Sequence, residues 1–317
     1  MENKEERKQW FNMTFEKLLE LNTGNSDTIT RQYIDRLVIE MRLINSGLAS
    51  TEAEIFGQKI DTPIMMGAIA GYEFFGDDSV VKEARCAAET NTVIWLNEHL
   101  TDDEIKACVD TGAKTAMVIK PYLELQRFLD LAGKMEDFGC IAIASDIDHA
   151  YDKRTGGLDK GMNGGVFGPR SSEELQTIVK TLKVPFVPKG VLSVQDAVAC
   201  EEAGVKHIIV SHHHNIMDCS VPPLMILPDI KKAVSDDMTV IVDCGIDTGA
   251  DAFKALALGA DFVCTARAIM KAMKNDCENG AAQVIRTNTA QLKNFLNRTG
   301  SPDIRHIDPS VIHLLPF

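Results

Sequence analysis

Short apolar runs rich in β-branched residues recur along the chain, and segments with helical spacing separate them. There are eight such runs, and they span residues 63–69, 92–96, 115–119, 140–145, 185–189, 207–211, 239–243 and 261–265. A continuous apolar run of this length is typical of a parallel strand that is buried on both faces. The pattern therefore predicts eight parallel strands, each followed by a helix.

Helix start signals lie in the expected places between these runs. Four segments carry a capping-box pattern, at Thr101 with Glu104, Ser171 with Glu174, Ser193 with Asp196, and Thr248 with Asp251. Eight strand–helix units in roughly 200–250 residues predict an α/β fold of the (β/α)₈ (TIM) barrel type. The alternative is a doubly wound open sheet, but "MGAIAGYEFFG" after the first run is not its glycine-rich G-x-G-x-x-G turn.

We expect residues 1–317 to form a single barrel domain. Residues 1–60 precede the first strand and are predicted to be mostly helices that cap the barrel, with a polar break at 22–27. Residues 151–170 contain six glycines among basic residues and are predicted to form a mobile loop over the active face. The alternative for this loop is a disordered insertion with no role.

Composition narrows the possible partners and compartments. The 33 Lys and Arg against 46 Asp and Glu give a net charge of −13, which disfavours nucleic acid and anionic membranes as partners. No 18-residue apolar run is present and the start of the chain is charged, so we expect a cytoplasmic protein without a spanning helix. The eight cysteines form no C-x-x-C pair and are expected to be buried, reduced thiols.

Candidate functional residues follow from the barrel prediction, because such barrels carry their chemistry at the C-terminal ends of the strands. The last four predicted strands end in polar groups, namely Lys189; Ser211 with His212, His213 and His214; Asp243 with Gly245; and Ala266 with Arg267. Glycines and helix starts after strands seven and eight are typical of a phosphate site, to which Arg267 adds a positive charge. The alternative is that the glycines only turn the chain and Arg267 pairs with a surface acid.

Lys189 and the three histidines are the most reactive of these candidates. An inward ammonium at Lys189 needs an anion, which an anionic cofactor edge would supply, although a solvated or ion-paired lysine is an equal alternative. Strand alternation would place His213 on the face opposite His212 and His214. Two histidines on one face do not complete a zinc site, so no metal is predicted. A histidine at this position suits a general base, and at least one of the three is expected to be an ordinary polar residue.

Two stretches of this half of the chain resemble a known family. "PFVPKGVLSVQDAVACEEAGVKHIIVSHHHN" and "IVDCGIDTGADAFKALALGADFVCTARAIM" are similar to the C-terminal half of the FMN-dependent α-hydroxy-acid oxidising enzymes, the group of glycolate oxidase, lactate oxidase and flavin-dependent lactate dehydrogenase. A weaker likeness extends to residues around the first strand and to "NTGNSD". The resemblance implies FMN as cofactor, a small-molecule substrate and a homo-oligomer, by analogy a tetramer.

The resemblance also implies roles for individual residues. It places Lys189 beside the N1/O2 edge of the flavin and His213 as the catalytic base. On the cofactor side it implies contacts from Ala68, Lys189, Ser211, Asp243, Gly245, Ala266 and Arg267. Substrate contacts would come from Lys153 or Arg154, with His212 and His214 as neighbours of the base.

The substrate side departs from the family pattern. The arginine that pairs with the substrate carboxylate in the family falls on Ile216, and two tyrosines fall on Leu21 and Met117. A desolvated carboxylate without a charged partner is disfavoured by several kcal/mol. We therefore expect a substrate other than a simple small 2-hydroxy acid, or a replacement cation from Lys153, Arg154 or Lys160.

Three functions are compatible with these features. The first is an FMN-dependent oxidoreductase that acts on a CH–OH donor. The second is a non-redox FMN enzyme that resembles type 2 isopentenyl diphosphate isomerase, with the glycine-rich loop binding a diphosphate. The third is a catalytically silent flavin-binding barrel. The first accounts for His213 and Lys189 together, and we favour it.

Overall fold

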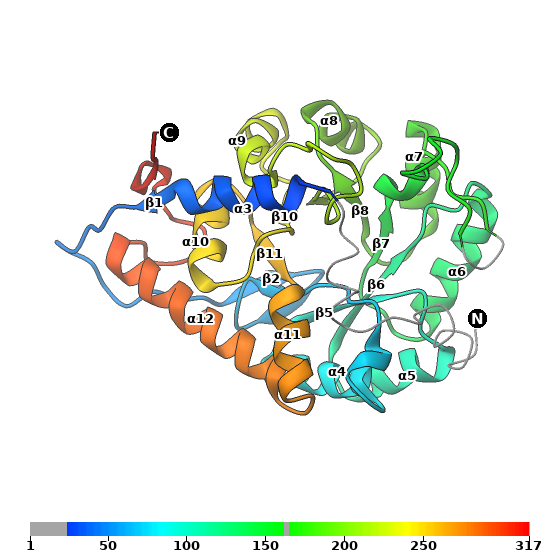
Figure 1. The fold of residues 1–317 in the computed structure, drawn as a ribbon, viewed down its shortest axis with the longest axis horizontal. Coiled ribbons are helices and arrows are strands. Elements are labelled where there is room, and N and C mark those ends of the chain that lie inside the picture. Colours follow the sequence, from blue (N-terminus) through cyan, green and yellow to red (C-terminus); the bar gives the residue numbers. More distant parts are fainter. Residues whose placement is uncertain (1–23, 162–164, 317) are drawn as a thin grey trace.

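The computed structural model describes residues 24–161 and 165–316, and its centre is a closed barrel of eight parallel strands (Figure 1). The barrel strands are β4 (Ile64–Met66), β5 (Val93–Asn97), β6 (Lys114–Ile119), β7 (Ile143–Asp146), β8 (Phe186–Val191), β9 (His207–Val210), β10 (Thr239–Val242) and β11 (Phe262–Thr265). Each overlaps one of the eight predicted runs, and β11 pairs with β4 to close the barrel. The predicted (β/α)₈ barrel is confirmed, and the open doubly wound sheet is wrong.

Helices separate the strands and surround the barrel. They are α4 (Ser79–Glu89), α5 (Asp102–Asp110), α6 (Leu125–Asp137), α7 (Ser172–Thr181), α8 (Val194–Glu202), α9 (Pro223–Ala233), α10 (Gly249–Ala257), α11 (Arg267–Asn275) and α12 (Gly280–Thr299), with short 3₁₀ turns at Tyr72–Phe74, Ile147–Ala150 and Pro309–Val311. Thr101, Ser171 and Thr248 cap their helices with both bonds of the capping box. Ser193 accepts a bond from the backbone N–H of Asp196. The four sequence signals thus mark real helix starts.

The core has two layers, and one end of the barrel is closed. One cluster fills the barrel interior and includes Met65, Trp95 and Ile209, while a larger one lies between the strands and the helices. A hairpin of β2 (Ala53–Ile55) and β3 (Gln58–Ile60) brings the Phe56 ring to 5.0 Å from His207, the first residue of β9. The hairpin therefore covers the N-terminal ends of the strands, which leaves the C-terminal ends for function.

The segment before the barrel contributes to both ends of the barrel. The described part contains one helix, α3 (Ser26–Arg36), followed by β1 (Leu37–Ile39), which pairs with β12 (Ile312–Leu314). Residues 37–60 therefore hold three short strands and no helix, where we predicted mostly helices, and residues 1–23 lie outside the described residues. Helix α3 passes over one end of α10 (Figure 1), and Arg31 of α3 pairs with Asp251 of α10 at 2.8 Å. This contact holds the start of α3 close to the mouth of the barrel.

The glycine-rich segment 151–170 folds back on itself over short backbone bridges. Tyr151 pairs with Leu158, Lys160 with Val166, and Phe167 with Tyr122, while residues 162–164 lie outside the described residues. The predicted mobility of this loop stays a prediction. Among the described residues, no helix combines the length and apolarity needed to cross a bilayer. All eight cysteines are free thiols, and six of them are buried, whereas Cys219 is exposed and Cys277 is half-buried.

One buried acid in the helical layer has consequences for stability. The Glu83 side chain on α4 is fully buried, and its Oε2 accepts a bond from the Tyr72 hydroxyl at 2.7 Å. Its Oε1 has no hydrogen-bond partner among the described residues. Burial raises the pKa of Glu83 to about 8, although the Tyr72 bond lowers it slightly. In the unfolded chain this carboxyl would titrate near its ordinary value, about 4.3.

Because the pKa of Glu83 is higher in the folded protein than in the unfolded chain, the free energy of unfolding falls as the pH rises and this carboxyl ionises. Stability from this group is present below about pH 4.3 and is lost progressively up to about pH 8, at roughly 1.4 kcal/mol per pH unit. Glu83→Gln should remove this loss, so that the variant gains on the parent protein between pH 5 and pH 8. Urea unfolding at the two pH values measures the gain. Glu89→Gln, an exposed change on the same helix, should show none, and an equal pH dependence of parent and Glu83→Gln would refute the assignment.

Candidate active site

A cavity of about 190 Å³ lies at the C-terminal ends of the barrel strands. Its lining includes eight of the residues singled out from the sequence, which are Ala68, Lys189, His213, His214, Asp243, Gly245, Ala266 and Arg267. We call it the cofactor cavity. The predicted cofactor residues therefore meet around one space, with the exception of Ser211, which lies behind it and accepts a bond from the backbone N–H of His213 at 2.9 Å.

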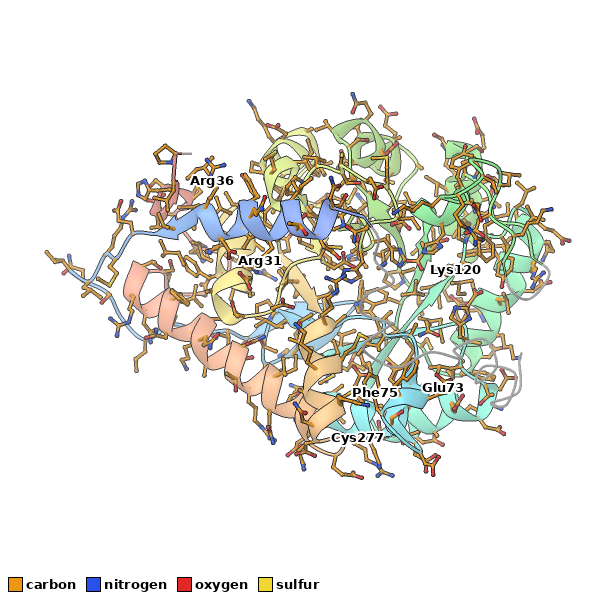
Figure 2. The ribbon with its side chains drawn as sticks, viewed as in Figure 1. Arg31, Arg36, Glu73, Phe75, Lys120 and Cys277 are labelled. Carbon is orange, nitrogen blue, oxygen red and sulfur yellow. The ribbon has the colours of Figure 1, made fainter. Side chains whose placement is uncertain are left out.

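One end of the cofactor cavity is suited to an anion. Helix α11 begins at Arg267, and its N-cap residue, Ala266, has no side chain that could bond to the first N–H groups. Arg31, which comes from α3 (Figure 2), also lines the cavity and is paired with Asp35 and Asp251, so two guanidinium groups and a helix N-terminus line it. Backbone N–H groups at a helix start and arginine side chains are the usual ligands of phosphate.

A carboxylate from α3 accompanies these cations. Asp27 pairs with Arg267, and its Oδ1 lies 3.4 Å from Nδ1 of His214. Burial alone would raise the pKa of Asp27, but His214 and Arg267 together lower it to about 2. Asp27 is therefore charged at any physiological pH and fixes the orientation of Arg267.

The other end of the cofactor cavity holds a buried ion-pair network. Nζ of Lys189 lies 2.9 Å from Oδ1 of Asp146, and Nζ of Lys120 lies 2.8 Å from Oδ2 of the same carboxylate. Lys189 also lies 3.8 Å from Asp243. Burial opposes charge on Lys189 and Asp146, yet Asp146 raises the pKa of Lys189 above its ordinary value, and the two lysines hold the pKa of Asp146 well below its own. Lys189 is thus a permanently charged ammonium in the wall of the cavity.

His213 stands beside this network. Its Nδ1 lies 3.1 Å from Oδ1 of Asp148 and 3.3 Å from Nζ of Lys189. Strand β9 ends at Val210, and His213, His214 and Asn215 all have positive φ angles of 47°, 50° and 65°. The expected strand alternation of the three histidines is therefore wrong, because the chain forms a left-handed turn from His213 to Asn215. His213 and His214 both line the cofactor cavity.

A second cavity, of about 340 Å³, lies on the other side of His213. Its walls are Ala70, Glu98, His99, Lys120, Tyr122, His149, Asp159, Lys160, Gly161, Phe167 and His213. We call it the substrate pocket. Oε1 of Glu98 accepts a bond from the Tyr122 hydroxyl at 2.6 Å, and burial raises the pKa of Glu98. The pocket is polar, and its wall includes the glycine-rich loop.

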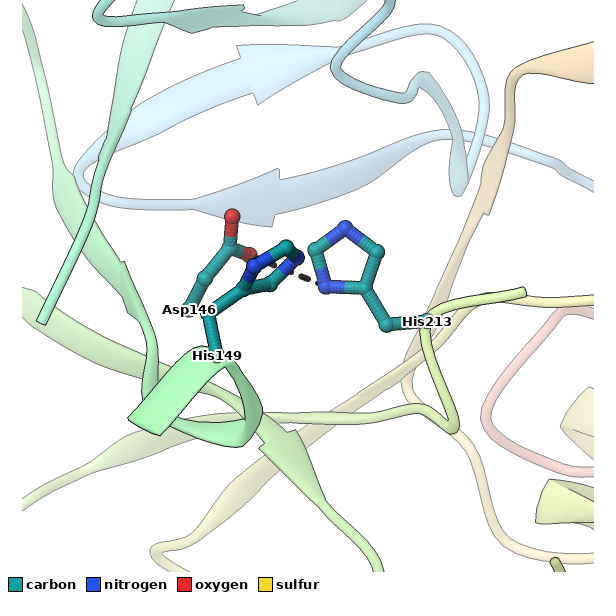
Figure 3. Close-up of side chains that lie close together, drawn as sticks. All are labelled: Asp146, His149 and His213. Atoms are coloured by element: carbon teal, nitrogen blue, oxygen red, sulfur yellow. Dashed lines mark ion pairs between the residues drawn. The ribbon is translucent and has the colours of Figure 1, made fainter. Parts of the chain in front are cut away.

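His149 faces His213 across the pocket, and Figure 3 shows both rings beside the Asp146 carboxylate. The ring centroids are 4.4 Å apart. Burial and the charge of Lys120 hold the pKa of His149 far below its ordinary value, so its imidazole is neutral. The ligand atoms of Asp146, His149 and His213 lie within 4.8 Å of one another, close enough for a metal ion. Both oxygens of Asp146 already accept bonds from ammonium groups, which makes an ion-pair network the better description.

Three of the four residues predicted on the substrate side lie outside both cavities, and the fourth, His214, lines the cofactor cavity. Lys153 pairs with Asp218 at 3.0 Å, Arg154 is largely exposed beside Asp152, and His212 is buried with its Nε2 2.8 Å from the Thr30 hydroxyl. None of these three lines the substrate pocket or the cofactor cavity. Lys160 lines the substrate pocket, which leaves it as the one suggested replacement cation that reaches the site.

Sequence reasoning missed several functional groups. Lys120 and Asp146 directly follow the third and fourth predicted runs, so reading the ends of all eight strands would have found them. Asp148 and His149 lie in the 3₁₀ turn after β7 and carry no recognisable signal. Asp27 and Arg31 come from a helix far away in the sequence, and no local pattern connects them to the site.

Comparison with known proteins decides the family. The family model described as FMN-dependent dehydrogenase matches residues 20–167 and 167–314, which is nearly the whole chain. The chain belongs to this family.

Individual relatives agree with this assignment. A 4-hydroxymandelate oxidase from Amycolatopsis orientalis is 27% identical, with 89% of this chain and 88% of the relative aligned. A 2-hydroxyacid oxidase from Dictyostelium discoideum is 24% identical over 92% of this chain and 84% of the relative. A solved mandelate oxidase structure has the same fold, with a TM-score of 0.84 at 23% identity and 98% of each chain covered.

The protein is accordingly an oxidoreductase that acts on CH–OH donors with FMN as its cofactor. The cofactor cavity fits FMN, because it combines an anion site at Arg267 and the α11 N-terminus with a buried ammonium at Lys189. Arg267, Arg31 and the N–H groups of α11 would hold the phosphate. Lys189 would meet the electron-rich edge of the ring. The family assignment does not favour the non-redox isomerase.

Removal of Arg267 should release the flavin. One charge-assisted hydrogen bond contributes about 1.5–3 kcal/mol, so Arg267→Ala should weaken FMN binding at least about tenfold. Quenching of FMN fluorescence on titration into apoprotein measures the dissociation constant. Arg286→Ala, which removes an exposed arginine paired with Glu89, should bind FMN like the parent. Unchanged affinity in Arg267→Ala would place the phosphate elsewhere.

Proposed function

We propose that the enzyme oxidises the carbinol carbon of a substrate bound in the substrate pocket, with His213 as the catalytic base. The observation that supports this most directly is that His213 lines both the substrate pocket and the cofactor cavity. A group in that position can touch a substrate hydroxyl while the carbinol hydrogen faces the flavin. FMN, when bound, accepts the hydride.

Each protein group would have a separate task. The imidazole of His213 takes the hydroxyl proton, which makes the carbinol carbon a better hydride donor. Lys189 stabilises negative charge at the cofactor side of the cavity. Asp146 keeps Lys189 charged, because it supplies the carboxylate that a buried ammonium requires.

We further propose that the substrate is not a small 2-hydroxy acid. Lys120 and Lys189, the two lysines beside His213, already share the carboxylate of Asp146, and Lys153 is paired with Asp218. The substrate pocket also carries Glu98 and Asp159, which repel an anion. At the positions where the family has an arginine and two tyrosines that hold the substrate, this chain has Ile216, Met117 and Leu21. Met117 is fully buried, and Leu21 lies outside the described residues. A carboxylate next to the carbinol carbon would thus find both lysines beside the base already paired, while Lys160, the other described lysine of the pocket, lines it together with Glu98 and Asp159.

A panel of matched donors tests this substrate assignment. Each pair shares a carbon skeleton but differs in the group next to the carbinol: lactate with propane-1,2-diol, and mandelate with 1-phenylethane-1,2-diol. We expect millimolar L-lactate and glycolate to reduce the flavin at least about tenfold more slowly than the best donor without that carboxylate, as for an unpaired charge in a buried site. Stopped-flow flavin absorbance under anaerobic conditions gives the rates. Rapid reduction by L-lactate would contradict the proposal.

Removal of the base should slow flavin reduction without releasing the flavin. With the best donor of the panel, His213→Ala should lower the rate of flavin reduction by about 10²–10⁴-fold and keep the flavin bound. His212→Ala should cost far less, because His212 contacts Thr30 of α3 and lines neither cavity. A His213→Ala enzyme that reduces its flavin at the parental rate would remove His213 from this role.

A further inference from the structure

The substrate pocket offers charged groups of both signs to a ligand. Glu98 and Asp159 contribute carboxylates to its wall, and Lys120 and Lys160 contribute ammonium groups. A charged substrate group would be attracted by one of these pairs and repelled by the other. A hydroxyl is uncharged and can both donate a hydrogen bond to a carboxylate and accept one from an ammonium. A substrate with several hydroxyls would therefore match this wall without a charge of its own.

The carboxylate of Glu98 is held in place as a hydrogen-bond acceptor. Glu98 directly follows β5, and its Oε1 accepts a bond from the Tyr122 hydroxyl at 2.6 Å. Its Oε2 accepts a bond from the backbone N–H of Lys120 at 2.8 Å. An ionised carboxylate has about four acceptor sites, so each oxygen can accept a further bond. The two existing contacts orient the remaining sites before a ligand binds, which lowers the cost of binding.

Tyr122 and His149 add hydrogen-bonding groups of mixed character. The Tyr122 hydroxyl gives its hydrogen to Glu98, so its oxygen can still accept a bond. His149, whose pKa is held far below its ordinary value by burial, has a neutral imidazole with one donor and one acceptor nitrogen. Its Nδ1 lies 3.9 Å from Asp159, beyond hydrogen-bond distance. The wall thus combines donors and acceptors that several hydroxyls can use.

The same wall also has apolar surface for the carbon chain of such a ligand. The rings of Tyr122 and Phe167 meet edge to face, with centroids 5.2 Å apart, and Ala70 and Gly161 are the small residues of the wall. Sites for small molecules typically combine apolar surface with a few placed polar groups, in cavities of this size. A polyol presents both C–H and O–H groups along its length, so it matches this combination.

The polar groups lie away from the reacting centre. His213 lines both cavities, whereas Glu98 and Asp159 line the substrate pocket and not the cofactor cavity. A carbinol at His213 would therefore face the flavin, and other hydroxyls of the same molecule would lie in the part of the pocket that carries the carboxylates.

We propose that the substrate pocket binds an uncharged polyol, and that Glu98 selects it by accepting a hydrogen bond from a hydroxyl remote from the reacting carbinol. The inference rests on the proposed function in that it takes this pocket to hold the hydride donor. In the reaction one CH–OH group becomes C=O, because its hydride passes to FMN and its hydroxyl proton passes to His213. The remote hydroxyls are unchanged and serve recognition.

Matched donors test the role of the remote hydroxyls. The pairs are glycerol with propane-1,2-diol, erythritol with butane-1,2-diol, xylitol with pentane-1,2-diol, and sorbitol with hexane-1,2-diol. Each pair shares a carbon skeleton and a terminal 1,2-diol and differs only in the remaining hydroxyls. With the FMN-loaded full-length protein under anaerobic conditions, the best polyol should reduce the flavin at least about 100-fold faster than its matched diol, because the diol leaves buried polar groups without a partner.

Variants of Glu98 show whether this residue sets the preference. In Glu98→Ala the ratio of the polyol rate to the diol rate should fall at least about tenfold, through a loss with the polyol alone. A merely structural role would slow both donors equally and leave the ratio unchanged. Glu98→Gln keeps the size of the side chain and one acceptor oxygen, so it should retain part of the ratio. Glu124→Gln, an exposed change that lines neither cavity, should keep the parental ratio.

Binding is measured separately from turnover. The best polyol is titrated into FMN-loaded His213→Ala, and the flavin absorbance reports its dissociation constant. Addition of Glu98→Ala to this variant should weaken polyol binding at least about tenfold and leave binding of the matched diol nearly unchanged.

The outcomes separate this inference from the proposed function. Equal rates with the polyol and its matched diol, or a parental ratio in Glu98→Ala, would overturn the inference while carbinol oxidation stands. If the proposed function fails, no donor reduces the flavin, yet the polyol still binds and its binding still depends on Glu98. Absence of both flavin reduction and polyol binding would overturn both.

Discussion

The ion triplet of Asp146 between Lys120 and Lys189 is the interaction on which the rest of the site depends. Burying two ammonium groups and a carboxylate costs several kcal/mol per ion unless their geometry is close, and here both contacts are below 3 Å. The triplet connects the ends of β6, β7 and β8, and it lies between the two cavities. Loss of Asp146 would remove the carboxylate that both lysines share, and loss of either lysine would leave Asp146 with a single ammonium partner, so the three strand ends depend on one another.

The triplet also contributes to the walls of both cavities. On the cofactor side it presents the ammonium group of Lys189, and Arg267, paired with Asp27, adds a guanidinium group to the same wall. On the substrate side, Lys120 of the triplet and Lys160 line the pocket together with the carboxylates of Glu98 and Asp159. One charge cluster thus supplies a lysine to the wall of each cavity.

Much of the fold follows from the sequence because continuous apolar runs and capping residues act locally. The runs at 92–96 and 239–243 reappear as β5 and β10 with shifts of one residue, and the capping boxes at Thr101 and Thr248 begin helices. The cofactor residues were predicted because strand ends meet in any closed barrel. The direction of the His213 side chain could not be predicted from strand alternation, because residues 213–215 form a left-handed turn and not a strand. Asp148 and Asp27 depend on tertiary contacts that no local pattern encodes.

The left-handed turn at His213–Asn215 links the cofactor site to the start of the described chain. Oδ1 of Asn215 accepts a bond from the backbone N–H of Asp27 at 2.7 Å, and His214 contacts the side chain of Asp27. Residues other than glycine pay a conformational cost in this backbone region, which these contacts to α3 offset. Docking of α3 and formation of the cofactor cavity are therefore linked equilibria. A ligand that binds only the completed cavity stabilises the docked helix by mass action, so that the first helix and the last strands of the barrel respond together to cofactor concentration.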